Sequence, residues 1–228
     1  MNESEYLFKE YCSQKNINYG RIVEGEGKSP DFWIELGNNK IVVEVKQIDP
    51  NAEEREVLNI PPEELSGEEV YHWGMPGERI RNKITSCLPQ LKTFANRIHP
   101  TLLVIYDNIK CHGIQMWPEL TDENAVKVAM YGIETVLISP EVAPEGEAKI
   151  IHRWHGHRRR LTAEHNTTLS GIAMLEKHNG LISLQVYHNY YAANPLPVKS
   201  LTSVGIPQFV LESEPIDCFP DWKAIGIT

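Results

Sequence analysis

The alternation of apolar and polar residues is clearest between positions 29 and 47, which read SPDFWIELGNNKIVVEVKQ. Two alternating stretches flank Gly37-Asn38-Asn39, a pattern typical of a β-hairpin. With Asn38-Asn39 as a two-residue turn, residues whose numbers add up to 77 face each other, so Asp31 lies opposite Lys46. Side chains alternate between the two faces of a strand. We therefore expect one entirely apolar face, made of Phe32, Ile34, Leu36, Ile41, Val43 and Val45.

The opposite face of this predicted hairpin carries three charged residues at one end. Asp31, Glu44 and Lys46 lie within a cross-strand or diagonal step of one another. Two carboxylates that converge at a strand edge can bind a hard divalent cation such as Mg²⁺. Such an ion polarises a phosphodiester and helps to generate hydroxide from water, and a neighbouring ammonium can orient that water. The alternative interpretation is an ordinary amphipathic hairpin with a solvated charged face.

Pro30-Asp31, followed after twelve intervening residues by Glu44-Val45-Lys46, resembles the PD-(D/E)XK nuclease superfamily, which includes restriction-like endonucleases. The resemblance implies a metal-dependent phosphodiesterase in which Asp31 and Glu44 bind Mg²⁺ or Mn²⁺ and Lys46 is the catalytic lysine. It also implies a restriction-endonuclease-like αβββαβ core. DNA is the expected substrate because it is the commoner one in the superfamily. An RNA-cleaving member, or a catalytically inactive nucleic-acid-binding module on the same fold, is the alternative.

Two other polar residues are candidates for supporting roles. Several superfamily members carry a polar residue where this chain has Gln47, but a regular strand would turn Gln47 to the apolar face, so that role needs a bend. A first helix is predicted over residues 3–15, and many superfamily members place an acidic residue on such a helix. Glu10 matches this by position, and a solvent-facing Glu10 is the alternative.

Hydrophobic periodicity predicts an α/β domain with a mixed sheet, in the order αβββαβ followed by αβ. Pro89 should kink or divide the longest helix. The irregular, glutamate-rich stretch Pro50–Gly77 is either a flap over the substrate or a surface excursion that contains a short helix. Also in this half we expect strands at Asn18–Glu24, Thr101–Asp107 and Ile133–Ile138, and helices at Glu78–His99 and Asp122–Tyr131.

The second half of the chain is predicted to be rich in β-structure. Lys149–Thr162 is interpreted as two short strands around His155-Gly156-His157. A second hairpin, Asn166–Glu176 with Leu181–His188, has the strong turn signal Asn179-Gly180. We therefore expect one domain over residues 1–228, with a nuclease-like core over about 1–140 and a β-rich extension over about 145–228.

The net charge of −9 does not favour nucleic-acid binding, but its distribution does. Residues 71–110 and residues 149–177 each contain 6 basic and 2 acidic side chains, a local net charge of +4. Such patches can contact a phosphate backbone, with Trp154 available for stacking, whereas solvated basic surfaces are the alternative. The candidate nucleic-acid-binding residues are Arg79, Arg81, Lys83, Arg153, Arg158, Arg159 and Arg160.

The remaining composition favours a cytoplasmic protein. No apolar run reaches 18 residues, so we expect no membrane partner, and no secretory signal is recognisable. The 4 cysteines are scattered without a C-x-x-C pair, as in reduced intracellular proteins. The sequence leaves the oligomeric state open, and a homodimer is compatible with it.

Overall fold

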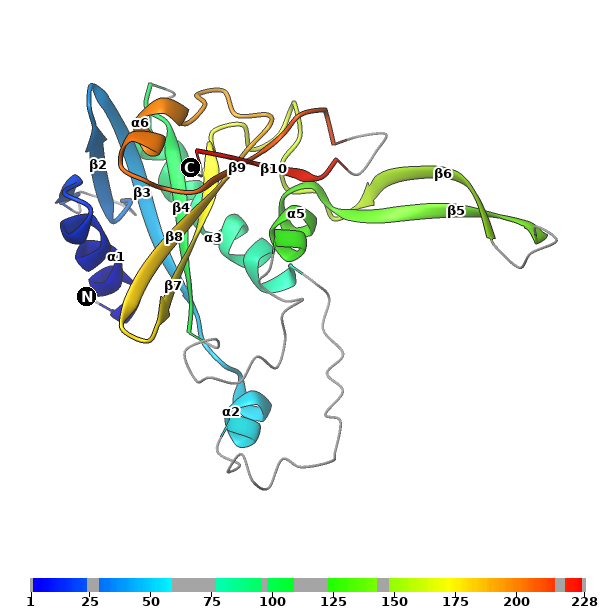
Figure 1. Cartoon of the computed structure of the whole chain (residues 1–228), viewed down its shortest axis with the longest axis horizontal. Coiled ribbons are helices and arrows are strands. Elements are labelled where there is room, and N and C mark those ends of the chain that lie inside the picture. The colour runs from blue at the N-terminus through cyan, green and yellow to red at the C-terminus, as the bar shows by residue number, and fades with distance from the viewer. Residues whose placement is uncertain are drawn as a thin grey trace.

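The computed structural model describes residues 2–23, 29–58, 77–95, 98–108, 123–142, 148–215 and 220–226 (Figure 1). The helices are α1 (Glu3–Gln14), α2 (Ala52–Leu58), α3 (Glu78–Ala95), α5 (Glu123–Tyr131) and α6 (Val198–Ser203). The strands are β1 (Asn18–Arg21), β2 (Phe32–Leu36), β3 (Asn39–Ile48), β4 (Thr101–Asp107), β5 (Ile133–Val142), β6 (Ala148–His157), β7 (Gly171–His178), β8 (Leu181–His188), β9 (Gln208–Leu211) and β10 (Trp222–Ile225).

One mixed sheet of 8 strands forms the centre of the protein, in the order β1-β2-β3-β4-β7-β8-β9-β10. The pairs β3–β4, β4–β7 and β8–β9 are parallel, and the other neighbouring pairs are antiparallel. The predicted element order holds as α1, β1, β2, β3, α3, β4, with α2 inserted before α3. Strands β7 to β10, predicted as part of a β-rich extension, continue this same sheet beyond β4.

Each face of the sheet has its own hydrophobic core. One core contains α1 residues and Leu201 of α6, together with all six apolar residues predicted for one face of the hairpin, so that prediction is confirmed. The other core contains the apolar side of α3 and most of α5. Because α3 packs against β3 from this second side, the face expected to be polar is also covered. Val42 and Glu44 are both 0% exposed there.

The predicted register of the β2–β3 hairpin is wrong by two residues. Phe32 pairs with Val43 and Leu36 pairs with Asn39, so the turn is Gly37-Asn38. Gly37 has a φ of 61°, and glycine at the first central position suits a II′ turn, which agrees with the twist of the strands. A shift of two residues keeps every side chain on its predicted face. It does, however, place Asp31 across from Glu44 instead of Lys46.

The second hairpin and the buried central strand are confirmed. Strand β7 pairs with β8 around Asn179-Gly180, and both turn residues have positive φ, as a type I′ turn requires. Strand β4 belongs to the interior, because every residue of Thr101–Asp107 is buried. Helix α3 is continuous across Pro89, so the proline does not divide it.

A two-stranded ribbon, β5–β6, projects from the body of the protein beyond α5 (Figure 1). The prediction of two short strands around His155-Gly156-His157 is wrong, because β6 runs unbroken from Ala148 to His157 and pairs with β5. The side chains of Arg153 and Trp154 lie outside the described part of the structure, so their proposed contacts with nucleic acid stay predictions. None of the described helices is both long and apolar enough to cross a membrane.

Candidate functional site

Asp31 and Glu44 meet where β2 begins beside the middle of β3. The carbonyl of Asp31 accepts a hydrogen bond from the Ile22 N–H at 3.0 Å, which fixes its backbone beside β1. Its side chain reaches across to β3, where Oδ2 accepts the Val45 N–H at 2.8 Å. Phe32 pairs with Val43, and extending this register by one residue places Asp31, which directly precedes β2, across from Glu44. The fold therefore brings two carboxylates together from separate strands.

Glu44 is a fully buried acid in this site, at 0% exposure. Burial raises the pKa of its carboxyl to about 7, and the nearby Asp31 carboxylate adds to the increase, whereas Lys46 and Gln90 oppose it. The Lys46 Nζ lies 2.5 Å from Glu44 Oε1. Neither carboxylate oxygen of Glu44 accepts a hydrogen bond of regular geometry within the described structure, so the contact with Lys46 acts as an ion pair.

Lys46 lies where the buried site meets solvent, because its side chain is 27% exposed. Lys83 of α3 lies near it: burial lowers the pKa of the Lys83 ammonium, and Asp49 partly opposes this while Lys46 and Arg79 reinforce it. Asp49 follows β3, and its Oδ1 accepts hydrogen bonds from Gln47 Nε2 at 2.6 Å and from Asn108 Nδ2 at 2.9 Å. Lys46 thus places a positive charge beside the Glu44 carboxylate on its solvent side, and Lys83 lies near Lys46.

Gln90 is a site residue that was not among the candidates. It lies on α3, and its Nε2 donates to the Ser29 carbonyl at 3.4 Å. Its amide also lowers the pKa of Glu44. Gln90 therefore links α3 to both the chain leading into Asp31 and the buried acid. A polar residue on the inward side of a predicted amphipathic helix was the signal that could have identified it.

The two predicted supporting residues do not lie with this carboxylate pair. Strand β3 continues without a bend through Gln47, whose side chain turns to the α1 face and accepts the Ser4 N–H at 3.2 Å. Glu10 lies on α1, which packs on the same face as Val45, opposite to Glu44. Its Oε1 accepts a weak hydrogen bond from Gln14 Nε2 at 3.4 Å. In this structure Gln47 acts on the first turn of α1, not on Glu44.

Arg79, a candidate phosphate contact, is held within the protein. Its Nη2 lies 2.6 Å from Oε1 of Glu54, which is only 2% exposed. Glu54 Oε2 also accepts the Asn51 N–H at 2.7 Å, and Asn51 Oδ1 accepts the Glu54 N–H at 2.8 Å, which together form a capping box for α2. Arg79 therefore neutralises a buried carboxylate and ties α3 to α2.

Three of the other candidate basic residues, Arg81, Arg158 and Arg160, are brought close to one another. Arg81 is 2% exposed and packs toward α5, so it does not project from a solvated helix end. Arg158 lies 3.7 Å from Glu78, one turn before Arg81 on α3. Arg159 Nη2 donates to the Pro215 carbonyl at 3.2 Å. The two basic stretches of the sequence, near residues 80 and 159, therefore meet at the beginning of α3.

The carboxylate pair fits a divalent cation in its donor chemistry. Asp31 and Glu44 supply oxygen ligands, and both Glu44 oxygens lack a regular hydrogen-bond donor in the described structure. Mg²⁺ commonly uses only one or two carboxylates and keeps several waters. Nowhere in the described segments do three His, Cys, Asp or Glu side chains gather as metal ligands. A cation at this position would therefore depend on two protein ligands, with water or substrate oxygens completing its coordination.

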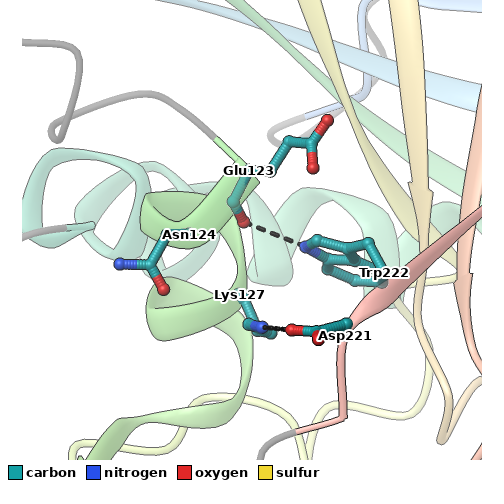
Figure 2. A pocket seen from close by; sticks show the side chains of 5 residues that line it. All are labelled: Glu123, Asn124, Lys127, Asp221 and Trp222. Atoms are coloured by element: carbon teal, nitrogen blue, oxygen red, sulfur yellow. Dashed lines mark hydrogen bonds and ion pairs between the residues drawn. The ribbon is translucent and has the colours of Figure 1, made fainter.

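A pocket of about 520 Å³ lies elsewhere, between the beginning of α5 and β10 (Figure 2). Figure 2 shows Asp221 pointing toward Lys127, whose Nζ lies 3.4 Å from Asp221 Oδ1. The Trp222 indole N–H donates to the Glu123 carbonyl at 2.9 Å. The polar groups that line the pocket thus dock β10 on α5. In the sheet order β10 is far from β2 and β3, which carry the carboxylate pair, so the pocket is not part of that site.

Comparison of the chain with protein-family models, with curated proteins and with solved structures gave no match.

Proposed function

We propose that this protein is a metal-dependent nuclease with a restriction-endonuclease-like core, which hydrolyses phosphodiester bonds, with DNA as the favoured substrate. The observation that carries the proposal is the buried Glu44 carboxylate facing Asp31, with Lys46 at 2.5 Å. The order α1, β1, β2, β3, α3, β4 is also compatible with such a core. Both observations, the site and the order of the elements, come from the structure of this chain alone and do not rest on similarity to another protein.

Each residue of the site would have a distinct role. Asp31 and Glu44 would hold Mg²⁺ or Mn²⁺, and a bound ion of this kind polarises the phosphodiester and lowers the pKa of water. The Val45 N–H fixes Asp31 so that its second carboxylate oxygen can face the ion. Lys46, at the solvent boundary, is positioned to orient the attacking water or to balance charge on the phosphate. Gln90 holds the segment that leads into Asp31.

A nucleic-acid-binding module without catalysis is the second candidate function, and one contact favours it. The Glu44–Lys46 ion pair already compensates the buried carboxylate, so the fold does not require a metal for that purpose. Binding by such a module would use basic residues outside the carboxylate pair. The two candidates differ in whether Asp31 and Glu44 bind metal, and in whether any substrate is cleaved.

A cleavage panel separates these candidates. Supercoiled plasmid, linear duplex DNA, single-stranded DNA and structured RNA are each incubated with the protein in Mg²⁺, Mn²⁺ or EDTA. We expect metal-dependent cleavage by the wild type, and loss of cleavage in Asp31→Asn and Glu44→Gln, which preserve side-chain shape. Cleavage of RNA alone would assign the RNA-cleaving alternative. Binding without cleavage of any substrate would favour the non-catalytic module.

A further inference from the structure

Arg81 is a buried charge without sufficient compensation. It closes the first turn of α3 and is 2% exposed. Its Nη2 donates to the Val128 carbonyl in the last turn of α5, at a long 3.5 Å. Its Nε and Nη1 have no hydrogen-bond partner within the described structure. Arginine stays protonated in proteins, and a buried charge is costly unless it is paired and hydrogen-bonded.

Two more arginines approach the same place from the segment after β6. The Arg160 N–H donates to the Met130 carbonyl at 3.1 Å, which puts Arg160 at the end of α5 beside Val128. Arg160 Nε is also buried without a partner among the described residues. Arg158 comes from the solvent side, with 47% of its side chain exposed, and lies 3.7 Å from Glu78. Burial, together with Arg158 and Arg160, lowers the pKa of Arg81, as close like charges do.

Within the described structure, these guanidinium groups have few acceptors. Glu78 lies beside Arg158 and also acts on Arg81. The carbonyl dipoles at the end of α5 offset part of the positive charge, whereas the N-terminal end of α3 adds to it. Arg81 Nε and Nη1 and Arg160 Nε have no partner among the described residues, and an anion with several acceptor oxygens would satisfy them.

We propose that Arg81, Arg158 and Arg160 form a binding site for a phosphate group, either as a terminal phosphate on a nucleic-acid strand or as free phosphate. A phosphate monoester carries between about −1.5 and −2 charges at neutral pH and has three acceptor oxygens. Guanidinium groups bind phosphate with paired N–H donors, and a helix N-terminus is a favourable place for an anion. The half-exposed Arg158 gives this site its access to solvent.

The phosphate site is separate from the carboxylate pair. Lys83 and Gln90 are on the side of α3 that faces Asp49, Ser29 and Glu44. Arg81 precedes Lys83 by two residues, which is about 200° around the helix, and it faces α5. Capture of a strand end rests on the nuclease function proposed above, whereas binding of free phosphate does not. Substitutions at the phosphate site and at the carboxylate pair therefore test the two proposals independently, and one proposal can be wrong while the other holds.

The first test measures binding of inorganic phosphate to the full chain in EDTA, by calorimetry and by thermal unfolding at constant ionic strength. We expect saturable binding with a rise in Tm for the wild type, and at least tenfold weaker binding for Arg158→Gln and Arg160→Gln. Arg81→Gln should abolish binding, but its burial can impair folding, so the other two variants decide the outcome. Lys177→Gln, at the exposed end of β7, is the matched control and should bind like the wild type.

The second test distinguishes the two sources of phosphate. Oligonucleotides with a 5′-phosphate, a 3′-phosphate or only hydroxyl ends are compared in EDTA. Tighter binding of a phosphorylated end, lost in Arg160→Gln, assigns a strand end, whereas equal binding of all oligonucleotides beside saturable inorganic phosphate assigns a free ligand. Glu44→Gln should keep its phosphate affinity even if it loses metal. Absence of saturable phosphate binding in the wild type, or wild-type affinity in both Arg158→Gln and Arg160→Gln, would overturn the proposal.

Discussion

The Val45 N–H donates a hydrogen bond to Asp31 Oδ2 at 2.8 Å, which fastens the aspartate to β3 between Glu44 and Lys46. The side chains on either side of Val45 point to the opposite face, so the same backbone donor positions Asp31 beside both of them. One Asp31 oxygen is used in this contact, and the Asp31 carboxylate lies close enough to Glu44 to raise its pKa. The geometry explains how two carboxylates are held together although they repel each other.

Glu44→Gln should stabilise the metal-free protein, increasingly so as the pH rises. The pKa of Glu44 is raised to about 7 in the folded protein, from about 4.5 in the unfolded chain. Below about pH 4.5 both states hold the proton, so burial of the acid carries no ionisation penalty. Between pH 4.5 and 7 the unfolded chain releases the proton first, and the wild type loses stability, by on the order of 3 kcal/mol in total. The measurement is urea unfolding in EDTA at pH 5.5 and pH 8.

The control for this measurement is Glu35→Gln, because Glu35 lies on β2 and accepts a hydrogen bond from Asn18 at a solvent-exposed position. Its effect on stability should change little between the two pH values. A difference between wild type and Glu44→Gln that stays constant from pH 5.5 to pH 8 would show that Glu44 does not titrate in this range.

Lys46→Met should separate metal binding from cleavage. The two carboxylates stay in place, so Mn²⁺ should still bind by calorimetry, while cleavage falls by roughly 10²-fold or more. Lys46 also lowers the pKa of Glu44, so its removal makes protons compete more strongly with the metal. We expect the metal affinity of Lys46→Met to recover between pH 7 and pH 8.5. Cleavage at the wild-type rate would contradict the role assigned to Lys46.

Arg79→Gln should act on stability and not on nucleic-acid binding. The substitution leaves Glu54 with 2% exposure and without its ion-pair partner, which should cost about 1–3 kcal/mol. Lys223→Gln is the comparison, because Lys223 pairs with Glu212 and both side chains are more than half exposed. That change should cost under about 1 kcal/mol. A normal unfolding free energy combined with a flatter salt dependence of DNA binding would instead assign Arg79 to phosphate contact.

Gly20→Ala should destabilise the edge of the sheet next to the carboxylate pair. Gly20 pairs with Trp33, and a Cβ at this position would lie 2.3 Å from Trp33 Cζ2. Overpacking of this kind costs about 1–3 kcal/mol. Trp33→Leu in the same chain should recover part of the loss, so the double variant should be less destabilised than the sum of the single variants. Strict additivity would show that the indole is not the obstacle.

Much of the hairpin could be predicted from sequence, because alternation fixes which face each side chain takes. The six apolar residues from Phe32 to Val45 are buried together as expected. The register was not predictable to the residue, since both Gly37-Asn38 and Asn38-Asn39 are plausible turns. Changing from one turn to the other shifts the pairing of the strands by two residues. Such a shift leaves every side chain on the same face, so the hydrophobic pattern could not distinguish the two turns.

The environment of the charged residues depends on tertiary contacts that no local pattern contains. Glu44 was expected on a polar face, and it is buried because α3, some forty residues later, covers that face. Arg81 was expected among phosphate contacts on a helix end, and it is buried because α5 packs against it. Hydrophobic periodicity predicts that α3 is amphipathic. It does not predict which strands and helices α3 covers, because these depend on the order of the strands in the sheet.

A crystal structure grown with Mn²⁺ at pH 8 would test the central claim most directly, because the anomalous signal locates the ion. We predict a peak between Asp31 and Glu44, with a carboxylate oxygen of each at about 2.1 Å, and with the Lys46 ammonium displaced from Glu44. A structure at saturating Mn²⁺ in which no ion lies between these carboxylates, and Lys46 still pairs with Glu44, would contradict the proposed metal-dependent nuclease site.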